Sequence, residues 1–391
     1  MTGTRIAVIG GGVAGCGAAR RAAQLGADVV LLEQDYPGSG SSGRSAGVYN
    51  IQTIDPLDVE IRIRARELFF QLERDRDLHL HRIGNVRVAT APDQMSRLAD
   101  VVALQRTLGA DDSQLLDRSD LQALVPDLDT ADLAGGLFGP NDGHLDGQML
   151  CTALVADAVA AGARVQNKSR VLTHRVTAEG AHELTTSKGT VVADAVINAS
   201  GAWARKTAET LGYHLNLLPQ LHEVIQVRLP RDLGYIVPMV NLYMPGQDGE
   251  ALYFRQDGPD SLIAGMHTYG LVEGIEVADP DNYSAKVSED YLIEVAEALT
   301  ARFHVNGLGF KPGWTGLYPI SPDGKFILGP EAHDPSVVTC SGLGGVGVTM
   351  GSIAGSIAAE WIIEGRPTTI PGADVLRPDR PALTGGSEVA G

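Results

Sequence analysis

Apolar and polar positions at the start of the chain follow the order strand, helix, strand. Residues 5–10 (RIAVIG) form a continuous apolar run, which is typical of a strand buried on both faces of a parallel sheet. The next stretch, GGGVAGCGAARRAAQLGA, predicts a glycine turn that opens an alanine-rich helix ending at Gly26. A second apolar run, ADVVLLEQ, follows it. The pattern therefore predicts a βαβ unit that starts at residue 5.

Further along the chain, periodicity predicts both helices and strands. Gly-rich, turn-rich segments at 36–50 and 135–147 predict loops. The predicted helices cover 56–76, 93–108, 119–125, 150–163, 289–303 and 349–365, and the predicted strands cover 84–90, 164–176, 191–204, 221–229, 251–256, 261–266, 325–329 and 336–342.

The alternation of these elements predicts an α/β fold with two interleaved domains. A Rossmann-like dinucleotide domain would be assembled from 1–83, 149–213 and 310–370. An α+β substrate domain, with a mixed, largely antiparallel sheet, would be inserted as 84–148 and 214–309. The Pro- and Gly-rich segment 371–391 predicts a flexible tail.

Composition narrows the class of protein. The 391 residues carry a formal net charge of −17, which disfavours binding to nucleic acid and to anionic membranes. The three cysteines, Cys16, Cys151 and Cys340, lie far apart without CxxC spacing, so neither a disulfide framework nor a metal site is expected. No signal peptide and no apolar run of about 18 residues is visible, and we expect a cytoplasmic protein outside the membrane.

The first glycines match a dinucleotide fingerprint. Gly10, Gly12 and Gly15 have the GxGxxG spacing, and Glu33 ends the second strand. The glycines allow a tight turn and close approach to a pyrophosphate, the helix N-terminus attracts it, and the acid accepts ribose hydroxyls. A carboxylate at this position would repel the 2′-phosphate of NADP, which leaves FAD and NAD open.

Four further stretches, in this order, carry a resemblance. They are GSGSSGRSAGV (38–48), VINASGAW (196–203), WTGLYPISPDGKFILG (314–329) and CSGLGGVGVTMGSIAG (340–355). Together with the fingerprint they resemble the FAD-dependent amine and D-amino-acid oxidase family, which includes glycine oxidase and sarcosine oxidase. The likeness covers about 365 residues and implies FAD as the cofactor.

The resemblance also implies which residues contact FAD. Residues 41–47 would follow the pyrophosphate and one edge of the flavin ring, Val171 would hold the adenine, and the turn at 342–349 would aim a helix N-terminus at the reduced flavin. The implied set is Gly10, Gly12, Val13, Ala14, Gly15, Glu33, Gln34, Ser41, Ser42, Arg44, Ser45, Ala46, Gly47, Val171, Ala199, Ser200, Gly201, Trp203, Gly316, Gly342, Leu343, Gly344, Gly345, Val346, Gly347, Val348 and Thr349.

The same comparison predicts that FAD is bound non-covalently. Relatives that attach the flavin use a His or a Cys where this chain has Arg44 and Gly316. No second glycine fingerprint for NAD(P)H is present, which argues against a monooxygenase or a disulfide reductase.

For the substrate, the resemblance implies oxidation of an amino acid or a secondary amine. Hydride would pass to flavin N5, water would hydrolyse the imine, and O2 or another acceptor would reoxidise the flavin, with H2O2 as the product from O2. Many relatives hold the substrate carboxylate with an Arg where this chain has Tyr318. An N-substituted glycine with a bulky or apolar N-substituent, which yields glyoxylate and a primary amine, would suit a site without that Arg. No residue is assigned to catalysis, and the residues considered for orienting the substrate are Arg44, Tyr253, Arg255, His267 and Tyr318.

Two other functions stay open on the sequence. One is an FAD-dependent dehydrogenase of 2-hydroxy acids or glycerol phosphate, which would need a basic anion site. The other is a noncatalytic FAD-binding subunit of a larger complex.

Overall fold

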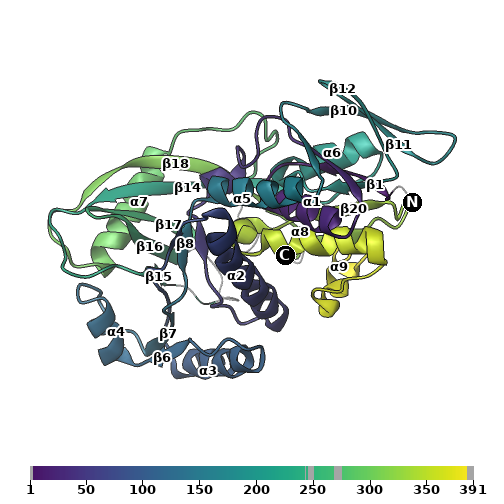
Figure 1. Ribbon diagram of the computed structural model, residues 1–391. Coiled ribbons are helices and arrows are strands. Elements are labelled where there is room, and N and C mark those ends of the chain that lie inside the picture. Colours follow the sequence, from purple (N-terminus) through teal and green to yellow (C-terminus); the bar gives the residue numbers. More distant parts are fainter. Residues whose placement is uncertain (1–2, 243, 245–250, 268–274, 385–391) are drawn as a thin grey trace.

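The apolar run at the N-terminus forms the centre of a parallel sheet. A computed structural model describes residues 3–242, 244, 251–267 and 275–384 (Figure 1). β1 pairs in parallel with β2 on one side and with β13 on the other, and both of its faces are buried. The order in this six-stranded sheet is β19 (Ile327–Pro330), β20 (Val337–Ser341), β13 (Ala195–Asn198), β1 (Arg5–Ile9), β2 (Asp28–Leu32) and β9 (Arg164–Gln166). The prediction of a βαβ unit that starts at residue 5 is confirmed.

Glycines let two helices pack closely on this sheet. A Cβ on Gly17 of α1 (Val13–Gln24) would lie 2.5 Å from the carbonyl oxygen of Ser352 in α8 (Gly347–Glu364). A Cβ on Gly355 of α8 would lie 2.0 Å from the carbonyl oxygen of Ala14 in α1. The two helices therefore touch backbone to backbone, and neither glycine tolerates a side chain without movement.

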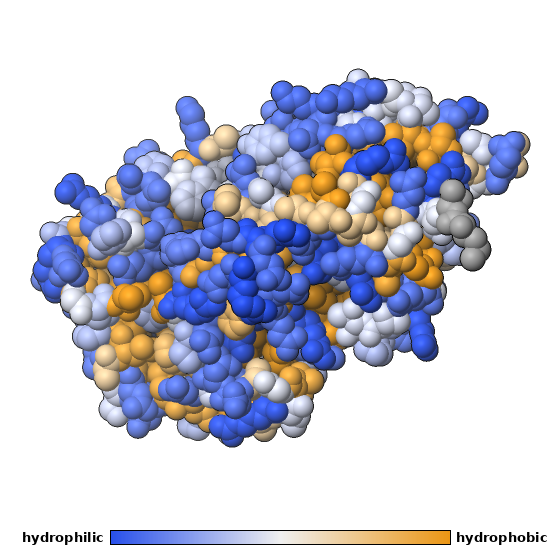
Figure 2. Space-filling model, in the orientation of Figure 1, coloured by the Kyte–Doolittle hydropathy of each residue, from blue (hydrophilic) through white to orange (hydrophobic). Residues whose placement is uncertain are grey.

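Among the described residues, one helical segment is long and apolar enough to cross a membrane, and it consists of α8 and the short turn before it. It covers Gly344–Glu364, and 72% of its most apolar window is buried inside the protein. Its apolar character follows from its position in the core, where it packs on the sheet beside α1 (Figure 1). On the face shown in Figure 2, hydrophilic residues cover most of the surface and apolar residues form separate patches.

A second, eight-stranded sheet forms the other half of the molecule (Figure 1). Its one parallel pair among the described strands is β5 with β15, as the expectation of a mixed, largely antiparallel sheet requires. α7 (Glu289–Arg302) packs on it through Val295 and Leu299, which share a core with Phe254. The strand order is β18 (Gly309–Ile320), β14 (Leu218–Arg228), β17 (Ser261–His267), β16 (Ala251–Gly258), β15 (Met239–Asn241), β5 (Asn85–Ala89), β7 (Gly135–Gly139) and β6 (Gln114–Leu116).

Strand β18 places one predicted domain boundary differently. Residues from 310 onward were expected in the dinucleotide domain, but β18 is the edge strand of the eight-stranded sheet and pairs with β14 over its whole length. Pro312 and Pro319 make this strand difficult to predict from the sequence, because proline usually argues against a strand. Proline is nevertheless tolerated in an edge strand such as β18.

The segment at 135–147 was predicted as a loop, but it contains two strands, β7 and β8 (Gly143–Leu145). β8 pairs with β3 (Val48–Tyr49) and β4 (Leu80–His81) in a small sheet between the two halves. A Cβ on Gly143 would lie 1.9 Å from the carbonyl oxygen of His81, so glycine is required for this close pairing.

The remaining elements cover the surface of the two sheets. α2 (Pro56–Arg76) begins at Asp55, whose side chain accepts hydrogen bonds from the backbone of Leu57 and Asp58. The others are α3 (Pro92–Thr107), α4 (Arg118–Leu124), α5 (Gly147–Ala160), α6 (Ala204–Leu211) and a three-stranded sheet of β10 (Val171–Val176), β11 (His182–Thr186) and β12 (Gly189–Ala193).

The C-terminal segment was expected to be flexible from residue 371, and the structure differs over 371–384. Residues Pro371–Leu376 form a 3-10 helix with Ala373 and Leu376 buried, and α9 covers Pro381–Thr384. Arg380 bonds both oxygens of Asp323 at 2.8 and 2.9 Å, which ties the segment to the main body. Residues 385–391 lie outside the described residues.

Candidate active site

The glycine turn after β1 forms the floor of the first cavity. Gly10 has φ +105°, and a Cβ on Gly15 would lie 1.8 Å from the carbonyl oxygen of Gly10. Both positions therefore require glycine. The turn brings the N-terminus of α1 to the cavity, where backbone N–H groups and the helix dipole favour a phosphate.

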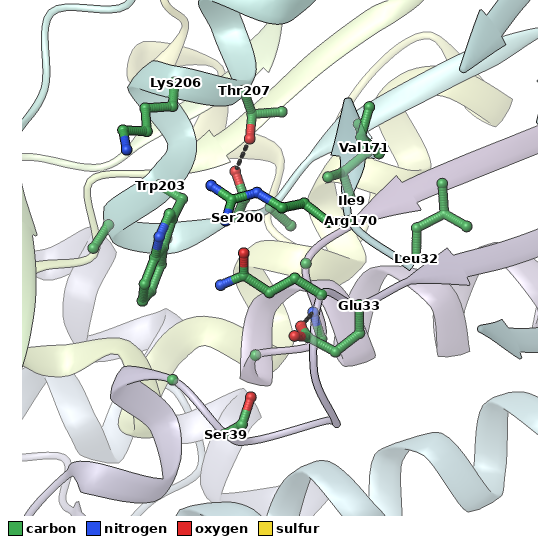
Figure 3. Close-up of a pocket in the computed structure, with 18 of the residues that line it drawn as sticks. Ile9, Leu32, Glu33, Ser39, Arg170, Val171, Ser200, Trp203, Lys206 and Thr207 are labelled. Carbon is green, nitrogen blue, oxygen red and sulfur yellow. Dashed lines mark hydrogen bonds between the residues drawn. The ribbon is translucent and has the colours of Figure 1, made fainter. Parts of the chain in front are cut away.

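Glu33 lies against this turn (Figure 3). Its Oε2 accepts the Gly11 N–H at 2.6 Å and its Oε1 accepts the Asp35 N–H at 2.8 Å. Burial raises the pKa of Glu33 above its ordinary value, and these backbone hydrogen bonds act against that rise. Glu33 lines the cavity, and each of its oxygens retains a lone pair for a hydroxyl donor such as a ribose.

The wall opposite Glu33 comes from distant segments (Figure 3). Val171 starts β10, and Ser200 follows β13, where its hydroxyl bonds Thr207 at 2.8 Å. The indole of Trp203 lies across the cavity from Glu33. A dinucleotide with its adenosine at this end matches the mixture of polar edges and flat apolar surface.

The second cavity continues the first. The two share Gly12, Ser41, Ser42, Ala199 and Gly201 among their lining residues. Beyond them, backbone from 316–319 and 343–348 lines the second cavity, which gives a flat ring close contact with bare chain. The N-terminus of α8 lies here, without an acidic residue in its first turn, so its dipole favours negative charge at this end.

The loop over this second cavity is held from the substrate half. The Ser41 hydroxyl donates to the carbonyl oxygen of Leu317 at 2.7 Å, and Trp314 Nε1 donates to that of Arg44 at 2.7 Å. Arg255 donates to the carbonyl oxygen of Ala46 at 2.7 and 3.1 Å. The position of the loop therefore depends on the eight-stranded sheet.

The third cavity opens from the second, and the two share Ser45, Tyr318 and Gly345. Aromatic rings form one wall of it. Tyr318 stacks on His222 with ring centroids 3.7 Å apart, and His267 lies edge-on to Tyr318 and to Tyr253. Burial lowers the pKa of His267 to about 3, with smaller contributions in the same direction from His222, Arg87 and Arg62. The His267 ring is therefore neutral at pH 7.

Two buried arginines line the same cavity. Arg62 of α2 and Arg87 of β5 are each 2% exposed. Arg62 donates to the side-chain oxygen of Asn50 at 2.7 Å, and Arg87 donates to the carbonyl oxygen of Gln52 at 2.9 Å. The described lining contains no Asp or Glu, so the cavity is positively charged.

The structure brings most of the predicted contact residues together. All of the residues implied for FAD line one of the three cavities, except Gly15, Gly47 and Gly342, which shape the backbone behind the lining. Of the residues considered for the substrate, Tyr253, His267 and Tyr318 line the third cavity.

The two predicted arginines have other roles. Arg44 donates to the hydroxyl of Tyr283 at 2.6 Å and lines the second cavity. Arg255 holds the loop through Ala46 and pairs with Asp257 at 2.8 Å, away from the described lining of the third cavity. The guanidinium of Arg255 is therefore occupied by these partners, and the structure does not place it with the other residues considered for the substrate.

Sequence reasoning missed the two arginines that do line the third cavity. Arg62 lies in a charged helix whose arginines look solvated, and Arg87 interrupts the strand pattern NVRVA. A signal existed at Arg87, since a charged residue at the centre of a strand that is buried on both faces needs a partner. Other lining residues not predicted include Gly11, Ser39, Gly40, Arg170, Lys206, Asn50, Met239, Asn241 and Cys340.

A segment from the substrate half reaches the rim of the first cavity. Backbone bonds at Ile275 and Val277 hold it to β14. Further on, Asp281 accepts hydrogen bonds from Arg170 at 2.6 Å, from Lys206 at 2.9 Å and from Trp203 Nε1 at 2.7 Å. All three donors line the first cavity, so we call residues 275–284 the strap.

The three cavities together fit the proposed dinucleotide. A phosphate-binding turn, an acid for the ribose, a flat glycine-lined slot and a helix N-terminus follow one another along a continuous lining. Cys340 is the only Cys or His in the described lining of the slot, and burial raises the pKa of its thiol to about 12. Among the described residues there is no group of three or more His, Cys, Asp or Glu side chains suited to a metal ion.

Comparison with known proteins agrees with this geometry. The profile of the family described as FAD dependent oxidoreductase (DAO) matches residues 5–361. The chain is 28% identical to mitochondrial sarcosine dehydrogenase of Mus musculus, over 93% of this chain and 40% of that protein. It is 26% identical to glycine oxidase of Geobacillus kaustophilus, over 91% of this chain and 92% of that protein.

Solved structures show the same fold. L-Proline dehydrogenase from P. horikoshii superimposes with a TM-score of 0.82 at 24% identity, over 96% of this chain and 97% of that one. The chain spans only about 40% of the length of the sarcosine and dimethylglycine dehydrogenases that it matches.

Proposed function

Because the chain belongs to the family of FAD dependent oxidoreductases, whose cofactor is FAD, we propose that it oxidises the C–N bond of a small amine that carries a carboxylate. Amino acids and N-substituted glycines fall in this class. The observation that carries the proposal is the continuity of the three cavities, in which Tyr318 and Gly345 border both the flavin slot and a cavity with two buried arginines. A carboxylate anchored there would place the neighbouring carbon at the flavin end of the cavity.

The chain holds the cofactor along its glycine turns. The N-terminus of α1 would bind the pyrophosphate and Glu33 the ribose. The N-terminus of α8 stabilises negative charge at the flavin end without a titrating side chain. When bound, FAD accepts two electrons from the substrate as a hydride and passes them to O2 or another acceptor.

The side chains of the third cavity keep the substrate amine unprotonated. Loss of hydration in the cavity lowers the pKa of the substrate amine, and the described lining contains no Asp or Glu that would hold a proton on it. His267, neutral at pH 7, adds no charge that would hold a proton on the substrate. A neutral amine has the free lone pair that assists removal of a hydride from the adjacent carbon, and water then hydrolyses the imine.

We also propose that FAD is held without a covalent bond. A protonated, buried Cys340 is a poor nucleophile, and no histidine lines the described part of the flavin slot. Acid denaturation of the purified protein should release all of the yellow cofactor into the supernatant. Colour that stays with the precipitate would contradict this.

The test of the function is an anaerobic panel. We expect N-alkyl glycines or α-amino acids to bleach the long-wavelength flavin band, and we expect peroxide after O2 is admitted. Bleaching by 2-hydroxy acids or glycerol phosphate, with none by amines, would assign the enzyme to the other class of donors. A noncatalytic subunit would be reduced by dithionite but by no member of the panel.

A further inference from the structure

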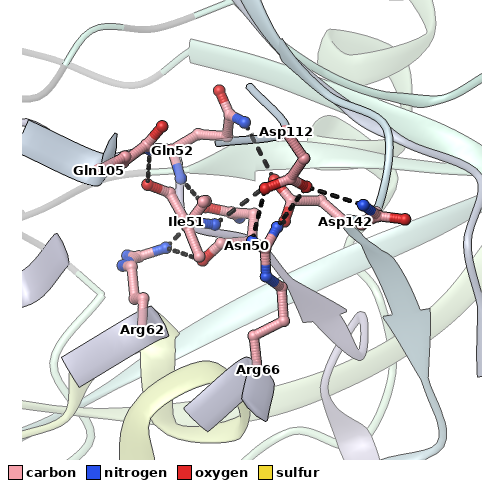
Figure 4. A network of polar contacts seen from close by, with 9 residues as sticks. Asn50, Ile51, Gln52, Arg62, Arg66, Gln105, Asp112 and Asp142 are labelled. Atoms are coloured by element: carbon pink, nitrogen blue, oxygen red, sulfur yellow. Dashed lines mark hydrogen bonds and ion pairs between the residues drawn. The ribbon is translucent and has the colours of Figure 1, made fainter. Parts of the chain in front are cut away.

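Arg62 and Arg66 lie one turn apart on α2 and differ in whether acidic side chains neutralise their charge (Figure 4). Arg66 donates to Asp112 at 2.7 and 2.9 Å and to Asp142 at 3.0 Å. Among the described residues, Arg62 donates only to Asn50, at 2.7 Å to its side-chain oxygen and at 3.3 Å to its carbonyl oxygen. Within the described residues no carboxylate forms an ion pair with Arg62, and its Nε has no hydrogen-bond partner.

This difference matters because burial of an unneutralised charge is costly. The fold neutralises Arg66 with two acids, as a structural arginine requires. Asp58 lies one turn before Arg62 on the same helix, and burial raises the pKa of its carboxyl to about 6 despite the attraction of Arg62. No ion pair joins the two side chains among the described contacts, so the guanidinium of Arg62 keeps donors for a ligand.

Arg87 presents a second cation to the same cavity from the eight-stranded sheet. Both guanidinium groups are held by one short segment, since Asn50 bonds Arg62 and Gln52 bonds Arg87. Such bonds fix the direction of each guanidinium before a ligand arrives. The described lining of the cavity then contains two fixed cations and no anion.

We propose that this cavity recognises an amine that bears two carboxylates, with Arg62 and Arg87 as the anion-binding residues. The inference rests on the proposed function and names its substrate class. Two carboxylates match the two buried cations, whereas an N-alkyl glycine offers one. The suggestion of an apolar N-substituent, which came from the Tyr318 position alone, is replaced by an N-carboxyalkyl one.

The simplest member of the class is iminodiacetate. One C–H and one C–N bond break, water supplies the aldehyde oxygen, and the two electrons removed reduce O2. The balanced reaction is iminodiacetate plus O2 plus water to glyoxylate, glycine and H2O2.

Binding is tested first without turnover. Diglycolate and methoxyacetate share an ether chain, cannot be oxidised at nitrogen, and carry two carboxylates and one. Titration of the holoenzyme, followed by the shift of its flavin spectrum, should show diglycolate bound about 10- to 100-fold more tightly, the size expected for one more charged hydrogen-bonded pair. Equal affinities for the two ligands would overturn the inference.

Variants then assign the effect to Arg62. Arg62→Gln should reduce the preference for diglycolate to less than about threefold, since one of the charged pairs is lost, and Arg62→Lys should restore part of it. Arg64→Gln is the matched control, because Arg64 lies on the same helix, is exposed, and pairs with Glu67.

Thermal unfolding separates recognition from a structural role. Arg62→Gln should melt at or above the wild-type temperature with full FAD content, because it removes an unneutralised buried charge. Arg66→Gln should melt lower, because it leaves Asp112 and Asp142 without their partner. A large fall in the melting temperature of Arg62→Gln would contradict the proposal.

The outcomes for function and for specificity are distinct. If no amine bleaches the flavin but diglycolate binds through Arg62, the anion site stands and the proposed oxidation fails. If N-methylglycine bleaches the flavin with the same efficiency as iminodiacetate, the oxidation stands and the two-carboxylate inference fails.

Discussion

Removal of the Asp281 carboxylate should speed the loss of FAD from the protein. Asp281 is the point at which the strap meets the first cavity, through Arg170, Lys206 and Trp203. Partial burial alone would raise the pKa of Asp281, but the hydrogen bonds from these three donors hold it well below its usual range. The carboxylate is thus charged at any pH used in an assay.

The size of the effect follows from these contacts. The side chains of Asp281, Arg170 and Lys206 are 32%, 47% and 39% exposed, so each ion pair is screened and contributes no more than about 1 kcal/mol. The bond from Trp203 adds a similar amount, about 1 kcal/mol. With about 0.5 kcal/mol for each screened ion pair, Asp281→Ala should remove about 2 kcal/mol of the free energy that holds the strap on the first cavity, which corresponds to roughly 30-fold faster release of FAD.

The assay is dilution of the holoenzyme, followed by the rise in fluorescence of free FAD. Asp279→Ala is the matched control, because the described contacts of the Asp279 side chain are to Lys206 and to the backbone N–H of Asp281. Added salt should accelerate release from the wild type and change the Asp281→Ala rate little, because the ion pairs are already lost. Equal release from wild type and Asp281→Ala at low salt would refute a closing role for the strap.

Three further predictions concern other parts of the site. Burial raises the pKa of Glu331 to about 7 from 4.5, so folding retains its proton and wild-type stability falls as pH rises between these values; Glu331→Gln should flatten that fall when melting temperatures are compared at pH 5 and pH 8. Gly345→Ala would place a Cβ 2.5 Å from the Tyr318 ring and 2.8 Å from that of His267, so it should weaken substrate binding while absorbance shows FAD retained. His267→Gln should raise KM but leave the shape of the pH profile of kcat/KM unchanged above pH 5, because the pKa of His267 is about 3. If the wild-type profile falls at acidic pH and the variant's does not, this prediction is contradicted.

The dinucleotide half could be predicted because its determinants are local in sequence. Gly10, Gly15 and Glu33 lie within 30 residues, and backbone geometry alone demands glycine at the first two. The turn before α8 was found for the same reason. Short-range chemistry of this kind is visible in one chain without knowledge of its fold.

The substrate half could not be predicted in the same way. Arg62 and Arg87 belong to a helix and a strand 25 positions apart, and only the packing of α2 beside the eight-stranded sheet brings them to one cavity. Arg62 and Arg66 look alike in the sequence, and the difference between them is set by Asp112 and Asp142, which arrive from other segments. Strand β18 was not predicted because it contains prolines, which the sequence pattern treats as strand breakers. Prolines are tolerated there because β18 is an edge strand, and its position at the edge is known only from its pairing with β14.

The contact of α1 with α8 through Gly17 and Gly355 sets a fixed span between two helix ends. One end would face the phosphates of bound FAD and the other its ring, and the interlocked glycines prevent the two helices from sliding. The distance between these ends would therefore suit one length of cofactor. FMN, which lacks the adenylate half, would fill only the ring end and leave Glu33 and the Trp203 wall without a ligand, so we expect the protein to bind FAD in preference to FMN.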